Sequence, residues 1–400
     1  MPNQYFSPEG DLENYFTTEY WLIDQWVGDT LWTWGNSFNA QLGDNTTTYR
    51  STPVTTFAGG TNWKQVACGN AHVVAIKTDG TLWTWGGNSY GQLGINLSGS
   101  TIGRTTPVTT IAGGTNWKQV ACGNYHTLAI KTDGTLWSWG YDNSGQLGDN
   151  STLGRNSPST TFAGGTNWKQ VACGNNYTAA IKTDGTLWTW GQNPYGQLGI
   201  NIAAGSNRLT PVTTFAGGTN WKQVTCGGNN TTAIKTDGTL WIWGLNNFGQ
   251  IGDNTTGSSR CTPVTTFAGG TDWKQVKCGG NQFTTAIKTD GTLWVWGSNS
   301  QGQLGINTPL DRPTPVTTFA GGTNWKQVST GYQHTATIKT DGTLWTWGRN
   351  SYGGLGVNDT TQRPTPVTTF AGGTNWKQVA SGYHHIAAIT SGTDPTFFIA

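Results

Sequence analysis

Residues 61–86 read TNWKQVACGNAHVVAIKTDGTLWTWG, and near-identical copies of this stretch recur along the chain. Its opening Asn-Trp-Lys-Gln-Val and its closing Leu-Trp-x-Trp-Gly each occur seven times, with Asp272 replacing the asparagine once. Self-similarity at a fixed period is the signature of a repeat architecture. The tryptophans of the opening motif are Trp63, Trp117, Trp168, Trp221, Trp273, Trp325 and Trp376.

One copy contains four short segments rich in the residue types that favour β-strands. We predict these strands at residues 63–67, 72–77, 82–85 and 108–111. The Asp79-Gly80 pair between the second and third strands predicts a type I′ hairpin. Pro107 has no N–H for a sheet ladder, so the fourth strand is expected at the outer edge. Four strands per repeat at this spacing indicate a β-propeller blade.

The two ends of the chain carry complementary halves of a repeat. The Leu-Trp motif at Leu31 lacks a preceding Asn-Trp-Lys, and Trp376 lacks a following Leu-Trp. Strands within residues 376–389 would complete the blade begun at Leu31 and leave no open edge around the ring. We therefore predict an all-β, seven-bladed β-propeller of four-stranded blades over residues 28–400, closed by N- and C-terminal strands. Further strands at residues 397–399 or 20–25 stay open alternatives.

One repeat carries a combination of motifs that points to a known family. Residues 123–130 read GNYHTLAI and are followed by DG at 133–134, LWSWG at 136–140 and GQLG at 145–148. This combination resembles the regulator of chromosome condensation repeat family, and the likeness covers about residues 29–389. The resemblance implies a seven-bladed propeller closed by both termini, in agreement with the repeat count.

Function does not follow from the resemblance alone, because a propeller is a platform that many activities share. The family includes a guanine-nucleotide exchange factor acting on chromatin, a plant ultraviolet-B photoreceptor and a secreted inhibitor of β-lactamases. The photoreceptor's Gly-Trp-Arg-His-Thr runs are absent here. Near-identical repeats look like the repeat proteins of bacteria and of phages of aquatic bacteria, which implies a virion or surface role.

Charge and hydropathy argue against several function classes. Charged residues make up only 10% of the chain, the net charge is +2, and basic residues are spread evenly. A nucleic-acid footprint would be a concentrated basic patch, so we expect no nucleic-acid partner. No apolar run approaches the roughly 18–20 residues that span a bilayer, and the N-terminus lacks a secretory signal. We expect a soluble protein without membrane insertion.

The polar groups repeat sevenfold, whereas catalysis needs one converging constellation. The aspartates of the Asp-Gly turns fit turn chemistry, and the repeats contain no glutamate. We therefore predict no enzyme activity, no cofactor and no metal site. One repeat position holds a cysteine in five copies and Thr330 or Ser381 in the last two, which indicates small buried thiols rather than zinc ligands. These cysteines are Cys68, Cys122, Cys173, Cys226 and Cys278.

Two other repeated positions are interpreted as structural. Four histidines share a position that Tyr177 and other polar or aromatic residues fill elsewhere, which favours a hydrogen-bonding structural role. The two tryptophans of each Leu-Trp-x-Trp pair lie on one face of the sheet, so we expect them to pack between blades. The histidines are His72, His126, His334 and His385.

Each repeat also carries an arginine three positions before a proline, and symmetry arranges these arginines in a ring. The ring is a candidate site for an anionic partner, with local stacking or capping as the structural alternative. The arginines are Arg50, Arg104, Arg155, Arg208, Arg260, Arg312 and Arg363. The loops that follow the Gly-Gln-Leu-Gly motifs vary in length, which indicates either a binding face or relaxed constraint.

Residues 1–27 form a separate acidic, aromatic segment that we expect either to anchor the protein to another chain or to close the propeller. Its candidate anchor residues are Tyr5, Phe6, Tyr15, Phe16, Tyr20, Trp21 and Trp26. Our leading hypothesis is a structural interaction protein, a phage virion or surface component that displays variable loops and binds capsid proteins, tail proteins or a host surface receptor. The alternative is a soluble inhibitor or regulator, including exchange-factor-like activity.

Overall fold

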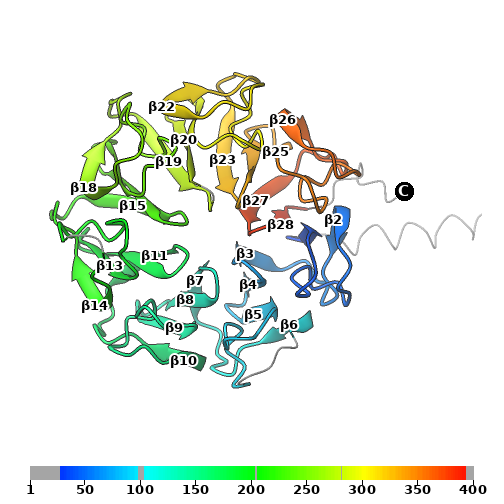
Figure 1. Cartoon of the computed structure of the whole chain (residues 1–400). Helices are drawn as coiled ribbons and strands as arrows, with labels where there is room; N and C mark the ends of the chain where they lie inside the picture. The colour runs from blue at the N-terminus through cyan, green and yellow to red at the C-terminus, as the bar shows by residue number, and fades with distance from the viewer. Residues whose placement is uncertain (1–27, 98–102, 203–204, 281, 393–400) are drawn as a thin grey trace, which may run out of the picture.

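The computed structural model describes residues 28–97, 103–202, 205–280 and 282–392. Over these residues the chain forms seven four-stranded antiparallel sheets arranged as blades around a central axis (Figure 1). The predicted anchor residues and the open strand alternatives at 20–25 and 397–399 lie outside the described residues. The predicted all-β, seven-bladed propeller is confirmed.

Each blade except the closing one runs from the axis outward in chain order. The innermost strands are β3 (Trp63–Cys68), β7 (Trp117–Cys122), β11 (Trp168–Cys173), β15 (Trp221–Cys226), β19 (Trp273–Cys278), β23 (Trp325–Thr330) and β27 (Trp376–Ser381). The second strands are β4 (His72–Lys77), β8 (His126–Lys131), β12 (Tyr177–Lys182), β16 (Asn230–Lys235), β20 (Phe283–Lys288), β24 (His334–Lys339) and β28 (His385–Thr390).

The outer half of each blade holds the Leu-Trp strand and the edge strand. The third strands are β1 (Leu31–Gly35), β5 (Leu82–Gly86), β9 (Leu136–Gly140), β13 (Leu187–Gly191), β17 (Leu240–Gly244), β21 (Leu293–Gly297) and β25 (Leu344–Gly348). The edge strands are β2 (Arg50–Thr55), β6 (Arg104–Thr109), β10 (Arg155–Thr160), β14 (Arg208–Thr213), β18 (Arg260–Thr265), β22 (Arg312–Thr317) and β26 (Arg363–Thr368).

The two ends of the described chain close the ring within one blade. Its strand order is β2-β1-β28-β27, so two strands come from each end. The register pairs Leu31 with Ile389 and Gly35 with His385. The predicted closure is confirmed, and it leaves every blade with the same four strands.

The fourth strand was placed too late by the sequence argument. It begins at Arg104 rather than at residue 108, and Pro107 lies inside it. The ladder with β5 pairs Thr84 with Val108 and Gly86 with Arg104, with an irregularity between these pairs. Pro107 occupies this irregularity at the edge of the sheet, where a missing N–H removes no regular ladder bond.

The Asp-Gly turn between the second and third strands is not the predicted type I′. Gly80 has a φ of +79°, but Asp79 is not in the left-handed region that type I′ requires at both positions. The Gly80 N–H donates to the carbonyl of Lys77 at 3.0 Å, and the Asp79 carboxylate accepts from the Thr81 N–H at 2.9 Å. The loop is therefore a type I turn followed by a left-handed glycine, as in three-residue hairpins.

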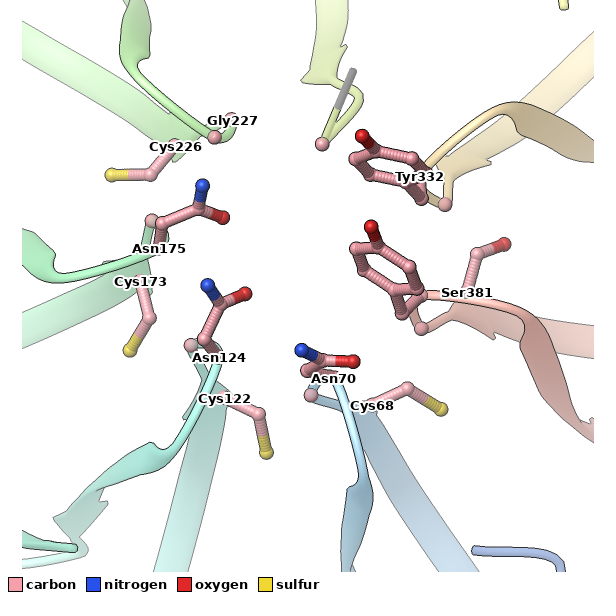
Figure 2. Close-up of a pocket in the computed structure, with 18 of the residues that line it drawn as sticks. Cys68, Asn70, Cys122, Asn124, Cys173, Asn175, Cys226, Gly227, Tyr332 and Ser381 are labelled. Carbon is pink, nitrogen blue, oxygen red and sulfur yellow. The ribbon is translucent and has the colours of Figure 1, made fainter. Parts of the chain in front are cut away.

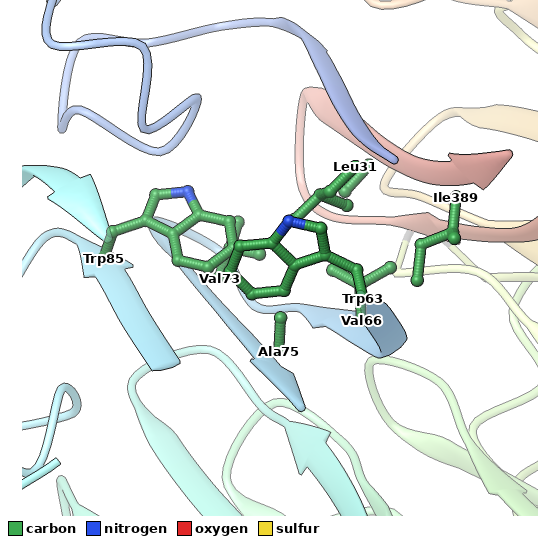
Figure 3. Packing of buried hydrophobic residues seen from close by; sticks show 8 residues of the cluster. Leu31, Trp63, Val66, Val73, Ala75, Trp85 and Ile389 are labelled. Atoms are coloured by element: carbon green, nitrogen blue, oxygen red, sulfur yellow. The ribbon is translucent and has the colours of Figure 1, made fainter. Parts of the chain in front are cut away.

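The core lies between blades, as predicted for the tryptophans. Trp63 and Trp85 of one blade meet Leu31 and Ile389 of the closing blade, and all four side chains are buried (Figure 3). The rings of Trp63 and Trp85 pack edge to face with centroids 6.2 Å apart. Such aromatic packing supplies much of the stabilisation in a core. Since each pair of neighbouring blades repeats the contact, each interface between blades is expected to contribute a similar share of the stability.

Two opposite faces result from this up-and-down strand order. We call loop face the side that carries the turns between first and second strands and the loops between third and fourth strands, for example residues 69–71 and 87–97. We call hairpin face the side that carries the Asp-Gly hairpins and the connections between blades, for example residues 78–81 and 110–116.

Candidate protein-binding face

Seven turns of the loop face surround the central axis and line a cavity of about 120 Å³. Asn70, Asn124 and Asn175 extend toward the cavity from one side, and Tyr332 lies on the opposite side (Figure 2). The residues at this one repeat position are Asn70, Asn124, Asn175, Gly228, Gly280, Tyr332 and Tyr383. The sevenfold symmetry is therefore broken at the rim of the cavity by two adjacent tyrosines.

These two tyrosines begin an aromatic cluster that spans neighbouring blades. The rings of Tyr332 and Tyr383 are stacked with centroids 4.0 Å apart, and His384 packs edge-on against Tyr383 at 4.5 Å. His384 also lies 5.3 Å from Tyr352, which packs against Phe38 at 5.5 Å. We call these five residues the aromatic cluster.

The electrostatics of the aromatic cluster keep it neutral. Burial, together with the nearby positive charge of Arg349, lowers the pKa of His384 to about 4. Burial and the neighbouring Tyr332 raise the pKa of Tyr383. Arg349 is held in place, since its Nη1 donates to Gln333 Oε1 at 2.8 Å and its Nε donates to Ser351 Oγ at 3.0 Å. The result is an uncharged aromatic surface beside one oriented guanidinium group.

A second group of tyrosines lies on the same face. Tyr90 contacts Tyr141 at 4.7 Å and Tyr125 at 5.0 Å between ring centroids. The Tyr125 hydroxyl accepts a hydrogen bond from Asn70 Nδ2 at 3.2 Å, which joins this tyrosine triad to the cavity rim. Tyrosine and other aromatic residues, together with arginine, dominate the energetically important centres of protein interfaces. The arrangement can therefore bind a protein surface.

The sequence analysis missed the aromatic cluster and the tyrosine triad. The signal was present, because Tyr332 and Tyr383 replace Asn or Gly at a position that the repeats align. The prediction of a binding face rested on differences in loop length between the repeats, and these single-residue differences were not part of it. The fold brings together Phe38 and Tyr352, which are more than 300 residues apart in the sequence, only once the ring closes.

The predicted arginine ring lies at the start of the seven edge strands, on the outer rim. Four of its members form ion pairs with aspartates of their own blade, as in Arg50–Asp44 at 2.9 Å and Arg155–Asp149 at 2.8 Å. The other paired arginines are Arg260 and Arg363. Arg104, Arg208 and Arg312 form no ion pair with a described residue. Four members thus form local ion pairs, whereas the structural alternative was stacking or capping. That alternative and the binding of an anionic partner by the ring both stay predictions.

The repeated cysteines have free thiols, as predicted. Cys278 is buried, whereas the other four of the repeat position are partly exposed, and all five line the central cavity. The thiol of Cys122 donates to the carbonyl of Ala67 in the preceding blade at 3.6 Å. Thr330 and Ser381 fill the same small space without this bond, since the Ser381 hydroxyl has no hydrogen-bond partner among the described residues. Burial raises the pKa of these thiols, so they are poor nucleophiles.

The repeated histidines are buried, but their predicted hydrogen bonding is only partly present. His72 Nε2 lies 3.0 Å from Thr127 Oγ1, and His126 Nε2 lies 3.4 Å from Thr178 Oγ1. Neither ring nitrogen of His385 has a hydrogen-bond partner among the described residues. The histidine rings instead fill the space beside the glycine of the preceding turn. A Cβ added to Gly69, for example, would lie only 2.4 Å from His72 Cε1.

Metal-binding groups and membrane-spanning helices are both absent from the part of the chain that the structure describes. It contains no group of three or more His, Cys, Asp or Glu side chains arranged to hold a metal ion. It also contains no helix with the length and apolar character needed to cross a membrane. The variable loops leave the third strands on the loop face, and their residues 98–102 and 203–204 lie outside the described residues.

Comparison with known proteins identifies the family. Residues 27–318 match the RCC1-like domain, and residues 325–353 and 341–389 match the regulator of chromosome condensation (RCC1) repeat. The chain belongs to the RCC1 repeat family. The family resemblance stated from the motifs is thereby confirmed.

Relatives within the RCC1 repeat family include a plant light receptor and a much longer ubiquitin ligase. The chain is 33% identical over 344 residues to the ultraviolet-B receptor UVR8 of Arabidopsis thaliana, covering 85% of this chain and 77% of the receptor. It is 29% identical over 340 residues to the E3 ubiquitin-protein ligase HERC2 of Mus musculus, covering 82% of this chain but only 7% of the ligase.

Solved structures show the same fold. Prp20p of Saccharomyces cerevisiae superposes with a TM-score of 0.79 at 18% identity, covering 92% of this chain and 93% of that one. That structure was described together with its binding to Gsp1p and histones. At this identity the likeness shows the fold alone.

Proposed function

We propose that this RCC1-type propeller is a non-enzymatic protein-interaction module that binds a protein partner through its loop face. The observation that carries the proposal is the aromatic cluster, where Tyr332 and Tyr383 replace the Asn or Gly of the other blades and meet His384 beside Arg349. The structure described for the distant relative Prp20p, with its binding to Gsp1p and histones, is consistent with a protein-binding use of the fold.

Affinity capture tests the proposal. The purified full chain is used as bait in an extract of its native source, beside a Tyr332→Asn/Tyr383→Asn variant that restores the residue found at Asn70. We expect the wild type to retain a protein that the variant loses. Phe162→Asn, which removes a 66% exposed ring from the hairpin face, is the matched control and retains the partner. Equal capture by all three proteins would contradict the proposal.

The finer hypothesis concerns the kind of assembly. The near-identical repeats and the aromatic residues 1–27 favour a virion or surface component, displayed with its loops outward and held by that segment. Recovery of capsid or tail proteins by the wild type supports this form of the proposal. Deletion of residues 1–27 then abolishes co-sedimentation with the particle while the propeller stays folded.

The second candidate is a soluble inhibitor or regulator, including exchange-factor-like activity. The observation that favours it is the neutral aromatic surface, which suits a single soluble partner as well as a particle. Recovery of one soluble enzyme or a small GTPase supports this candidate and overturns the virion form.

A further inference from the structure

The innermost strands enclose a second cavity, of about 250 Å³, on the central axis. It is lined by the segment from Gln65 to Cys68 and by the equivalent residues of the other blades. Exposed lysines precede these segments, at the end of the channel that opens on the hairpin face. They are Lys64, Lys118, Lys169, Lys222, Lys274, Lys326 and Lys377.

One position in this channel breaks the repeat. The residue before the cysteine position is Ala67, Ala121, Ala172, Thr225, Lys277, Ser329 or Ala380. Lys277 is the single charged side chain among the described residues that line the cavity. Its ammonium group forms no ion pair and donates no hydrogen bond to a described residue, and the cavity lining contains no carboxylate.

The glutamines of the channel present donors rather than acceptors. The Oε1 of Gln275 accepts the backbone N–H of Val328 at 2.9 Å, and Gln119 Oε1 accepts that of Val171 at 3.1 Å. Because the amide oxygens of the six glutamines that line the cavity are bound to a neighbouring blade, their Nε2 groups are left as donors; the seventh, Gln223, lies outside the lining. The glutamines whose Nε2 donates to no described residue are Gln65, Gln119, Gln275 and Gln327.

We propose that this cavity binds a small oxyanion, with Lys277 as its counter-charge and the glutamine amides as hydrogen-bond donors. An ammonium group away from water and without a partner is costly, and an anion in the cavity removes that cost. Burial lowers the pKa of Lys277, which agrees with a charge that has no counterion among the described residues. The lysines at the channel mouth add a positive potential that draws anions inward.

The test is calorimetric titration of the full chain with inorganic phosphate and, separately, with succinate, which distinguishes phosphate from carboxylate ligands. The deciding variant is Lys277→Ala. It installs the residue found at the same position in four other blades, so the propeller is expected to fold. We expect Lys277→Ala to weaken binding by about tenfold or more, the size of one charge-assisted hydrogen bond.

The matched control is Lys274→Ala, which removes one of the six mouth lysines that form no ion pair with a described residue and is expected to change affinity by less than about threefold; the seventh, Lys377, is paired with Asp29. Absence of phosphate and succinate binding at millimolar concentrations would overturn the proposal. So would equal affinities for the wild type and Lys277→Ala. Partner capture by the loop face does not involve Lys277, so the Lys277→Ala variant retains the partner and the two proposals fail separately.

Discussion

The hairpin face and the loop face are built from the same seven repeats, yet only one of them keeps the repetition. On the hairpin face, lysines lie over tryptophan rings in six blades, as Lys77 does over Trp83 at 4.4 Å. On the loop face, the cavity rim changes from Asn70 to Tyr332, and Arg349 appears once. The comparison teaches that the blade's contacts constrain one side and leave the other free.

The physical reason is the space behind each residue. A Cβ added to Gly80 on the hairpin face would lie 2.0 Å from the Thr115 carbonyl oxygen, so that turn tolerates no change. Tyr332 on the loop face points at an open cavity, so its position accepts side chains of any size. The rim position of Tyr332 therefore has room for binding specificity to develop.

The largest expected effect is a loss of stability at low pH, caused by the four repeated histidines just below the loop face. Burial lowers the pKa of His72, His126, His334 and His385 to about 3, so the folded state favours their neutral form. Stability is complete above the unfolded pKa of 6.5 and falls as the pH drops toward 3. We expect a loss of about 1.4 kcal/mol per pH unit for each histidine.

Urea unfolding at pH 7 and pH 5 measures this loss. His126→Asn and His334→Asn copy Asn230, the residue at the same position in another blade, and are expected to flatten the pH dependence. An unchanged slope in the double variant would show that the buried histidines do not control acid stability.

The next effect tests whether the constrained contacts are equivalent. Trp63→Ala and Trp273→Ala remove the same buried ring from two different blades, and each is expected to cost about 3–5 kcal/mol of unfolding free energy. Denaturant unfolding of both variants gives the comparison. Costs that differ by more than the experimental error would mean that the blades are less alike in packing than in sequence.

A smaller effect is expected at Asp142, where one carboxyl replaces the buried asparagine of other copies. Burial raises the pKa of Asp142 to about 8, and its Oδ2 has no hydrogen-bond partner among the described residues. Because the folded pKa lies above the ordinary value, stability is lost as the pH rises from 4 to 8. Asp142→Asn is expected to stabilise the protein by about 1–3 kcal/mol at pH 9 and by little at pH 4.

Thermal unfolding at both pH values checks this sign. The reverse change at an equivalent position, Asn193→Asp, serves as the control and destabilises the protein at pH 9. Stabilisation by Asp142→Asn that is the same at pH 4 and pH 9 would rule out carboxyl ionisation as the cause.

The smallest effect concerns the arginine ring on the rim. Arg155→Ala removes a half-exposed guanidinium from its ion pair with Asp149, whose side chain is only 6% exposed, and is expected to cost about 1 kcal/mol. Arg104→Ala, which has no ion pair with a described residue, is expected to cost less. Chemical denaturation of both variants decides the order, and a larger loss for Arg104 would contradict the assignment of local ion pairs as the stabilising contact.

The sequence predicted the architecture because its two tryptophan motifs count the blades and their offset closes the ring. It failed at Pro107, since the rule that excludes proline from regular ladders does not apply at an edge irregularity. It failed at Asp79-Gly80 because a two-residue and a three-residue hairpin share the same Asp-Gly signal. The aromatic cluster depends on contacts between blades, such as Phe38 with Tyr352, that exist only in the closed ring.

The central claim is that partner binding belongs to the loop face. The most direct measurement is the affinity of the captured partner for Tyr332→Asn/Tyr383→Asn and for Phe162→Asn, beside the wild type. We expect the loop-face variant to lose at least about tenfold in affinity, as for hot-spot aromatics, and the hairpin-face variant to bind like the wild type. Loss of affinity in Phe162→Asn with full binding by the tyrosine variant would assign the partner to the opposite face and contradict the account.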